Sequence, residues 1–159
     1  MNHKRVLFLL VLPLLVSVAC GGGAGIAPQS VPQPAAAHLT LQQYTDAAVP
    51  LLNDYADSWD RTNIMLEDPA IFTSQSLLDR MNTEVRLRAS TCDRLGNLDA
   101  PPEVREAAVE LNAACADGRE ADVNMMAGIR NADGFSLQRA VDYLYRALDH
   151  LNRAVDLLV

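Results

Sequence analysis

The chain has 159 residues, of which 50% are hydrophobic, 5% are aromatic and 21% are charged. Two of its 13 basic residues, Lys4 and Arg5, precede Cys20, whereas all 20 acidic residues follow it, so the chain after residue 19 carries a net charge of −9. Such a surface repels nucleic-acid phosphates and anionic lipid headgroups, so no nucleic-acid partner is expected. The length allows one domain, and abundant Ala and Leu with few aromatic residues favour an all-α fold.

Residues 1–19 have the pattern of a secretory signal peptide. The basic start MNHKR precedes the apolar segment VLFLLVLPLLVSVA, which has 14 residues. A helix that crosses a bilayer needs about 20 apolar residues, so this segment is too short for a stable membrane span. We therefore predict that residues 1–19 are removed and take no part in the fold.

Small residues end the apolar segment at Ala19-Cys20-Gly21, and this pattern resembles the processing site of bacterial lipoprotein precursors. The resemblance covers this segment only. It implies cleavage before Cys20 and acylation of the Cys20 thiol, with acyl chains such as palmitate anchoring the protein in a membrane. Ser17 stands where this family favours Leu. Cleavage by an ordinary signal peptidase at the same bond is the alternative, because Ser17-Val18-Ala19 also fits its small-x-small rule.

Residues 20–38 combine Gly and Pro without a hydrophobic period, which predicts a flexible tether. The folded domain is expected at residues 39–159. Its first helix begins at the N-cap Thr40, where Gln43 completes a capping box, and it contains Pro50, which predicts a kink. The apolar positions of this helix recur every three or four residues, at Leu41, Tyr44, Ala48, Leu51, Leu52, Tyr55 and Trp59.

The second helix is predicted from Ser74 or Ser76 to Leu95, with Gly96 as its stop signal. The third helix is predicted to start at Pro101 and Pro102, where missing N–H groups cost nothing. Its inner face carries Val104, Ala108, Leu111, Cys115, Gly118, Asp122, Met125 and Ile129, with Ala107, Ala114 and Ala121 beside them. The small residues allow a neighbouring helix to approach closely.

The fourth helix has the clearest apolar stripe in the sequence. The stripe alternates steps of four and three residues over Leu137, Val141, Leu144, Leu148, Leu151, Val155 and Leu158. Four amphipathic helices with short connections predict an up-down-up-down four-helix bundle. Three long helices with the first helix packed across them form the main alternative.

Cys92 and Cys115 are the thiols that remain if Cys20 is acylated, and both lie on predicted inner faces of an exported protein. Such thiols are expected to form a disulfide. A tight hairpin between the second and third helices would leave them about 15 Å apart, whereas bridged Cα atoms lie within about 7 Å. An extended connector over residues 96–102 covers roughly 23 Å and allows a register that pairs the two cysteines.

The same register predicts a buried ion pair. It places Arg88 within one turn of Asp122, and both residues lie on the inner faces of their helices. A tight hairpin would instead bring Arg88 near Glu110. The disulfide and the Arg88–Asp122 pair are therefore two predictions of one helix register.

No pattern in the sequence predicts a catalytic, cofactor or metal site. A di-iron bundle needs Glu-x-x-His on two helices, zinc needs clustered Cys and His, and covalent haem needs Cys-x-x-Cys-His, and the sequence has none of these. His150 follows Asp149 and is expected to be a solvated residue on a charged helix face. Asp54, Asp57 and Asp60 are likewise expected to form a solvated acidic face.

These observations predict a non-enzymatic, lipid-anchored helical-bundle protein of the bacterial cell envelope. It would lie outside the cytoplasm and act through its surface on another envelope protein. The alternative is a carrier or sensor that binds a small apolar ligand in a cavity between its helices near Trp59. Quenching of the fluorescence of this single tryptophan by apolar ligands would distinguish the two hypotheses.

Overall fold

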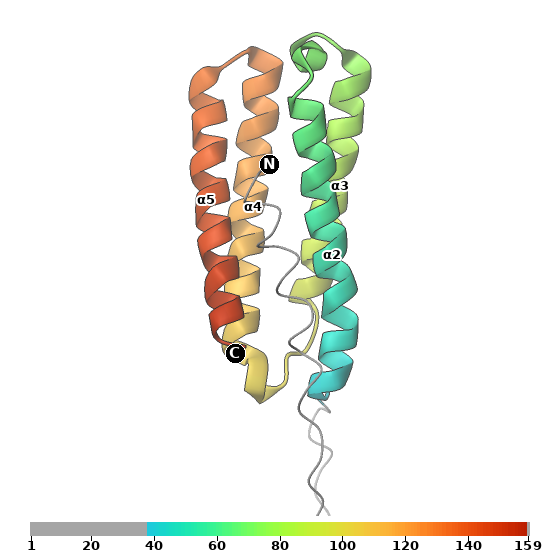
Figure 1. The fold of residues 1–159 in the computed structure, drawn as a ribbon, viewed down its shortest axis with the longest axis vertical. Helices are drawn as coiled ribbons and strands as arrows, with labels where there is room; N and C mark the ends of the chain where they lie inside the picture. The colour runs from blue at the N-terminus through green and yellow to red at the C-terminus, as the bar shows by residue number, and fades with distance from the viewer. Residues whose placement is uncertain (1–37, 159) are drawn as a thin grey trace, which may run out of the picture. The chain divides into compact units, whose positions relative to one another are not determined.

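The computed structural model describes residues 38–158 (Figure 1). The predicted signal peptide, Cys20 and the tether as far as residue 37 lie outside the described residues, so the lipid attachment stays a prediction. The described chain contains four long helices, α2 (Leu41–Leu66), α3 (Gln75–Gly96), α4 (Arg105–Asn131) and α5 (Gly134–Asp156), and two short 3-10 helices, η2 (Pro69–Phe72) and η3 (Pro102–Val104). The predicted all-α fold is confirmed.

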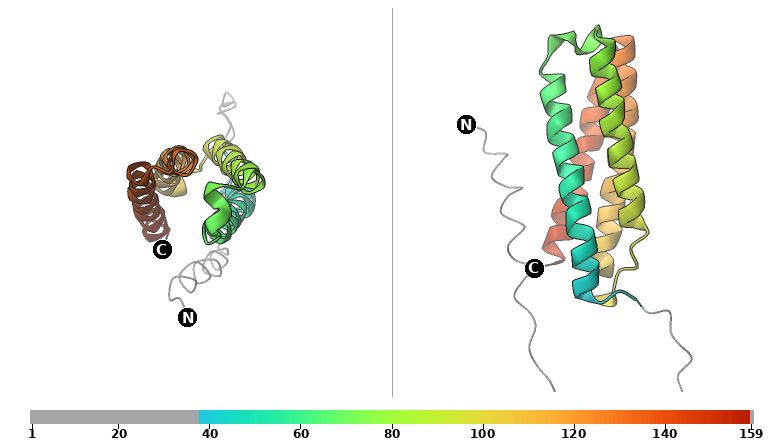
Figure 2. Two further views of the ribbon diagram at one scale, coloured as in Figure 1. Left: turned by 90° about the horizontal axis from the view of Figure 1, so that it is seen from above. Right: turned by 90° about the vertical axis from the view of Figure 1, so that its right-hand side faces the viewer.

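Successive helices run in opposite directions along a common axis, as both side views show (Figures 1 and 2). Helices that follow one another in the sequence pack together, which confirms the up-down-up-down arrangement. The α4–α5 contact is the most extensive and the α3–α4 contact is the least extensive of the three. Within residues 38–158, α2 and α5 do not pack closely on each other, so α4 is the main helical neighbour of α5.

The helix ends follow local sequence signals. The Thr40 hydroxyl accepts a hydrogen bond from the Gln43 backbone N–H at 3.2 Å, and the Thr40 N–H donates to Gln43 Oε1 at 3.0 Å, which is the predicted capping box. Ser74 caps α3 and Asp133 caps α5 in the same way, through side-chain oxygens. Pro50 lies inside α2, and the helix continues to Leu66.

The start of the third helix differs from the prediction. Pro101 and Pro102 were expected to open the α-helix, but Pro102–Val104 form the 3-10 helix η3 and α4 begins at Arg105. The Val104 N–H donates to the Pro101 carbonyl at 3.1 Å, which closes the tighter 3-10 turn before the α-helix begins.

The core has two apolar clusters, one at each end of the bundle. The cluster near the N-terminus of α2 contains Tyr44, Ala48, Leu51, Tyr55, Cys92, Leu95, Val104 and Cys115. The cluster near the α2–α3 connection contains Met65, Ile71, Met81, Met125, Met126, Ile129 and Ala140. Trp59 packs against both clusters and so lies between them.

The apolar stripe predicted for α5 is only partly buried. The residues of α5 that are buried are Ala140, Ala147 and Ala154, whereas Val141 and Leu148 of the predicted stripe are 41% and 43% exposed. The physical reason lies on α4, where Ala107, Ala114, Ala121 and Gly128 are buried at intervals of seven residues. Small side chains on both helices let the backbones approach closely, so the alanines of α5 face α4 and the larger side chains are turned aside.

Candidate functional site

Arg88 and Asp122 lie at the centre of a buried polar cluster. Arg88 is 1% exposed, its Nε donates to Asp122 Oδ2 at 3.1 Å, and its Nη2 donates to Asp122 Oδ1. Its Nη1 donates to the hydroxyls of Thr62 at 2.7 Å and Ser58 at 3.0 Å. The guanidinium also stacks 3.9 Å from the centroid of the Trp59 ring. The structure thus brings together the two residues that the cysteine register pairs, and adds three partners from α2.

The charges of this cluster neutralise each other. Burial raises the pKa of Asp122, and the adjacent Arg88 guanidinium acts in the opposite direction. No buried side-chain nitrogen or oxygen in residues 38–158 lacks a hydrogen-bond partner. Its hydrogen bonds link α2, α3 and α4.

The Cys92–Cys115 disulfide is confirmed. The Cα atoms of the two cysteines are 5.6 Å apart. Asp93 follows Cys92 on α3, and its carboxylate lies 2.6 Å from Arg119, one turn after Cys115 on α4. Both contacts follow the shifted register of α3 against α4. Disulfides persist in oxidising compartments, so this bond is consistent with a location outside the cytoplasm.

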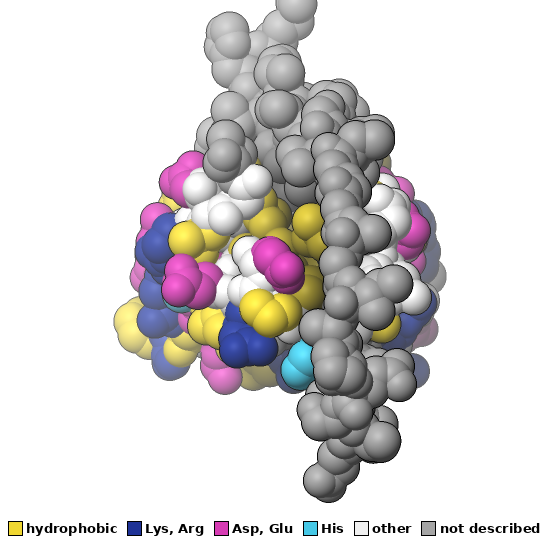
Figure 3. All heavy atoms as spheres, turned by 90° about the horizontal axis from the view of Figure 1, so that it is seen from below, with side chains coloured by type: hydrophobic (Ala, Val, Ile, Leu, Met, Phe, Trp, Pro, Cys, Tyr) yellow, Lys and Arg dark blue, Asp and Glu magenta, His cyan; other side chains and the backbone are white. Residues whose placement is uncertain are grey.

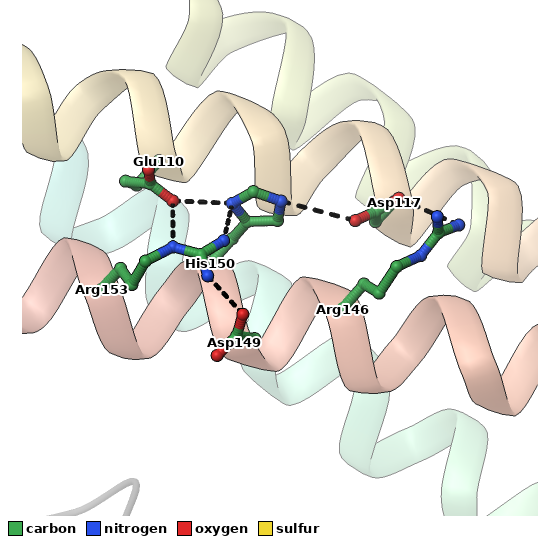
Figure 4. A network of polar contacts seen from close by, with 6 residues as sticks. All are labelled: Glu110, Asp117, Arg146, Asp149, His150 and Arg153. Atoms are coloured by element: carbon green, nitrogen blue, oxygen red, sulfur yellow. Dashed lines mark hydrogen bonds and ion pairs between the residues drawn. The ribbon is translucent and has the colours of Figure 1, made fainter.

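His150 is the centre of a second polar cluster, on the seam between α4 and α5 (Figure 4). Its side chain is 26% exposed, its Nδ1 lies 2.6 Å from Glu110 Oε2, and its Nε2 lies 3.6 Å from Asp117 Oδ2. Arg153 donates to the same Glu110 oxygen at 2.9 Å, and Arg146 lies 3.4 Å from Asp117. His150 lies among charged side chains as predicted, but it is less solvated than predicted, because two carboxylates of the neighbouring helix contact the ring.

The chemistry available to this second cluster is limited. Hydrogen bonds from His150 and Arg153 lower the pKa of Glu110, which keeps this group ionised. A histidine held by a carboxylate can act as a base, but none of the six side chains in Figure 4 is a hydroxyl or a thiol that it could activate. The cluster is best described as an ionic contact that joins α4 to α5.

Two surface pockets lie on α4, one beside the disulfide and one beside the second polar cluster. One of about 380 Å³ lies beside the disulfide, and one of about 510 Å³ lies on the α4–α5 seam between Val109 and Leu157, next to Glu110 and Arg153. Seen from the end of the bundle where α5 ends, apolar side chains lie among acidic and arginine side chains (Figure 3). Within residues 38–158, no group of His, Cys, Asp and Glu is arranged to hold a metal ion.

The surroundings of Trp59 bear on the carrier hypothesis. That hypothesis predicts an apolar cavity beside the ring, but the Arg88 guanidinium covers one ring face and Tyr55 meets the ring edge-on at 6.4 Å between centroids. Polar and aromatic groups of the protein itself thus occupy these sides of the indole. Binding of an apolar ligand near Trp59 stays a prediction.

The apolar side of α5 is partly exposed, and its residues follow a repeat in the sequence. The tetrapeptides Arg-Ala-Val-Asp at 139–142, Arg-Ala-Leu-Asp at 146–149 and Arg-Ala-Val-Asp at 153–156 recur every seven residues. The alanine of each repeat is buried on α4, and the next residue is Val141, Leu148 or Val155. The repeat gives α5 two adjoining apolar strips, one of alanines that packs on α4 and one of larger residues that is partly exposed.

The seven-residue repeat could have been found in the sequence, because it needs no structural information. The partners of Arg88 on α2 and those of His150 on α4 carry no such signal, since they lie 26 to 40 residues away along the chain. None of the described helices is long and apolar enough to cross a membrane. No known protein family, curated protein or solved structure that was compared with the chain matches it.

Proposed function

We propose that this protein is a non-enzymatic interaction module of the bacterial cell envelope, held at a membrane by lipid on Cys20. Its binding surface for a partner helix is the apolar side of α5, formed by Leu137, Val141, Leu144, Leu148, Leu151 and Val155, together with Leu158 just after the helix. The observation that carries this proposal is the exposure of Val141 and Leu148 at 41% and 43% on a helix whose alanines already bind α4. Large contiguous apolar surfaces on a folded domain are typical of interaction sites.

The anchor and the location are supported by two separate features. The segment before Cys20 resembles a lipoprotein signal, and the Cys92–Cys115 disulfide suits an oxidising compartment. The two polar clusters support a binding role over an enzymatic one, because both consist of charges that neutralise one another within the protein.

The anchor is tested with the full chain and the Cys20→Ala variant, expressed in a bacterial host and partitioned between detergent and aqueous phases. We expect the parent in the detergent phase and the variant in the aqueous phase, since the acyl chains supply the membrane affinity. Equal partitioning of the two chains would show that Cys20 is not the anchor.

The binding surface is tested by photocrosslinking in intact cells. A photoreactive amino acid at Leu148 should give discrete protein adducts, whereas the same amino acid at Val123 should not. Val123 is a matched control because it is an apolar residue, 64% exposed, on α4. Equal adducts from both positions, or none from Leu148, would contradict the proposed surface.

A further inference from the structure

We infer that the partner helix is α5 of a second copy of this chain, packed parallel to the first along the apolar stripe. This inference rests on the proposed binding surface and names its occupant. The observations that carry it are the composition of the repeat, the charge pattern around the stripe and the position of the tethered end.

The repeat in α5 has the composition of a two-stranded coiled coil. In heptad notation, the a positions are Val141, Leu148 and Val155, and the d positions are Leu137, Leu144, Leu151 and Leu158. A strict seven-residue period keeps one seam facing one partner helix over its whole length. β-Branched residues at a with Leu at d favour two parallel strands, and two of the three a positions here are Val. Within α5 the stripe runs from Leu137 to Val155 and is about 27 Å long at 1.5 Å per residue, and Leu158 follows just after the helix ends.

α4 covers part of this stripe, because Leu137 packs against Gly128 of α4. The alanines that bind α4 are at the g positions, so the a and d residues lie on the adjoining side of α5. Leu144 and Leu151 at d are half-buried, while Val141 and Leu148 at a are the more exposed. The d leucines therefore lie closer to the bundle, and the more exposed a residues would make the first contact with the second copy.

The charges of α5 are kept away from the stripe. The repeats place Arg139, Arg146 and Arg153 at f and Asp142, Asp149 and Asp156 at b, on the opposite side of the helix from the seam. The e positions beside the seam are Gln138, Tyr145 and Asn152, which are uncharged. In a chain with a net charge of −9 after residue 19, an uncharged strip is the surface on which two identical copies repel each other least.

The position of the termini selects the parallel arrangement. α2 begins and α5 ends at the same end of the bundle (Figure 1). The chain that precedes residue 38 includes Cys20, so two copies anchored in one membrane have their α5 helices pointing in the same direction. In a parallel pair, each a or d residue meets the same residue of the other copy.

The test uses the full chain purified in mild detergent and measures its mass by analytical ultracentrifugation. We expect a dimer whose dissociation constant rises by more than about tenfold in Leu148→Glu, because the new charge would face its own copy, and is unchanged in Val123→Glu. Circular dichroism checks that both variants are folded. Because the copies carry like charge, added salt should strengthen the dimer.

Cysteine crosslinking tests the interface in the membrane without a disruptive charge. Val141→Cys and Leu158→Cys replace two exposed residues of the stripe, and each should give a covalent dimer under mild oxidation, whereas Val123→Cys should not. Dimers from neither stripe position would overturn the parallel pair.

The outcomes separate this inference from the proposed function. A monomeric parent whose photocrosslinker at Leu148 captures a different protein overturns the self-association and leaves the interaction module standing. A monomer that captures no protein, and whose Trp59 fluorescence is quenched by an apolar ligand, overturns both and supports the carrier. A dimer that survives Leu148→Glu overturns the assigned surface.

Discussion

Arg88 is the largest side chain that is fully enclosed among residues 38–158. Its five hydrogen bonds reach α2 and α4 from α3, so one side chain determines how three helices meet. A buried ion pair contributes little net stability over an apolar core, but loss of one partner leaves an uncompensated charge. Its main effect is therefore on specificity, because a shifted register would leave the guanidinium without acceptors.

Replacement of Arg88 tests this role. Arg88→Met should lower the free energy of unfolding by about 3–5 kcal/mol, because Asp122 would remain buried without its partner. The double variant Arg88→Met, Asp122→Leu should recover most of this loss. Urea unfolding followed by circular dichroism measures both. Arg119→Met, in the exposed pair with Asp93, is the control and should cost less than about 1 kcal/mol.

Gly118 is required because the Tyr55 side chain approaches the backbone of α4 closely at this position. A Cβ built at this position would lie 2.2 Å from Tyr55 Oη and 3.5 Å from Tyr55 Cζ. Only the Tyr55 hydroxyl therefore excludes a larger residue at position 118, because 3.5 Å to the ring carbon is an ordinary van der Waals distance. The glycine lets the Tyr55 side chain pack directly on the backbone of α4.

This contact predicts that Tyr55→Phe removes the destabilising effect of Gly118→Ala. Gly118→Ala should destabilise the protein by about 1–3 kcal/mol through overpacking. In the Tyr55→Phe background the same change should be neutral or stabilising, because alanine has the higher helix propensity and its methyl group then has room. Thermal unfolding of the four chains measures this coupling. Gly134→Ala, where a Cβ meets nothing within 4 Å, is a control for glycine replacement itself. Additive effects would contradict the stated contact.

At the level of helices, α5 shows which part of the packing follows from sequence. The periodicity identifies the stripe of larger apolar side chains but not Ala140, Ala147 and Ala154, which are the residues of α5 that are buried. It does not reveal that Ala147 is buried while Leu148 is 43% exposed, because both are apolar and are neighbours on the helix. That choice depends on the small residues of α4, and therefore on tertiary contact.

The register of α3 against α4 was accessible from the sequence for a different reason. A disulfide requires a short Cα separation, so pairing two cysteines limits the distance between their helices at that point and sets the register. The Arg88–Asp122 contact follows from this register. No comparable constraint relates α2 to α3 or α4 to α5. The partners Thr62 and Ser58, and the enclosure of His150, could not be derived for that reason.

The α4–α5 seam should weaken in acid. Hydrogen bonds in the folded state lower the pKa of Glu110 from its ordinary value of 4.5, so its contribution to stability is present above that pH. It is lost as the pH falls below about 4.5 and the carboxylate is protonated. Glu110→Gln should therefore reduce the dependence of the urea midpoint on pH between about 5 and 3.

Two other carboxyls contribute to the same acid response. Glu84 bonded to Arg61, and Asp133 at the start of α5, also have a lowered pKa in the fold, so Glu110→Gln should remove only part of the slope. The exposed Glu106, one turn earlier on α4, provides the matched control Glu106→Gln. An unchanged slope in Glu110→Gln would contradict the contribution of the contact to His150 and Arg153.

For the molecule as a whole, the bundle consists of two helical hairpins joined along α3 and α4. The α4–α5 hairpin has the most extensive contact, whereas the α3–α4 contact is smaller and includes the disulfide and the Arg88–Asp122 pair. His38 adds an exposed contact at 2.8 Å to Asp99 in the connector between the hairpins. The joint between hairpins thus depends on a few specific bonds.

Reduction of the disulfide should therefore affect the two hairpins unequally. The bond connects residues 23 positions apart, and its loss should cost about 3 kcal/mol. Hydrogen exchange followed by mass spectrometry should show faster exchange mainly in α2 and α3, with α4 and α5 retaining most of their protection. Cys92→Ser, Cys115→Ser should reproduce the pattern without reductant. Equal loss of protection in all four helices would show that the bundle opens as one unit.

The location of the disulfide also determines how the protein would respond to a mechanical load. A pull on the N-terminal end of α2 would act first on that helix, which has no covalent bond to the rest of the bundle other than the chain itself. Once α2 and α3 had been drawn out, the load would pass from Cys92 directly to Cys115, so residues 93–114 could not be extended. At up to about 3.5 Å per residue, the disulfide prevents roughly 75 Å of chain from being extended. The disulfide between α3 and α4 would therefore limit how far the protein can be stretched.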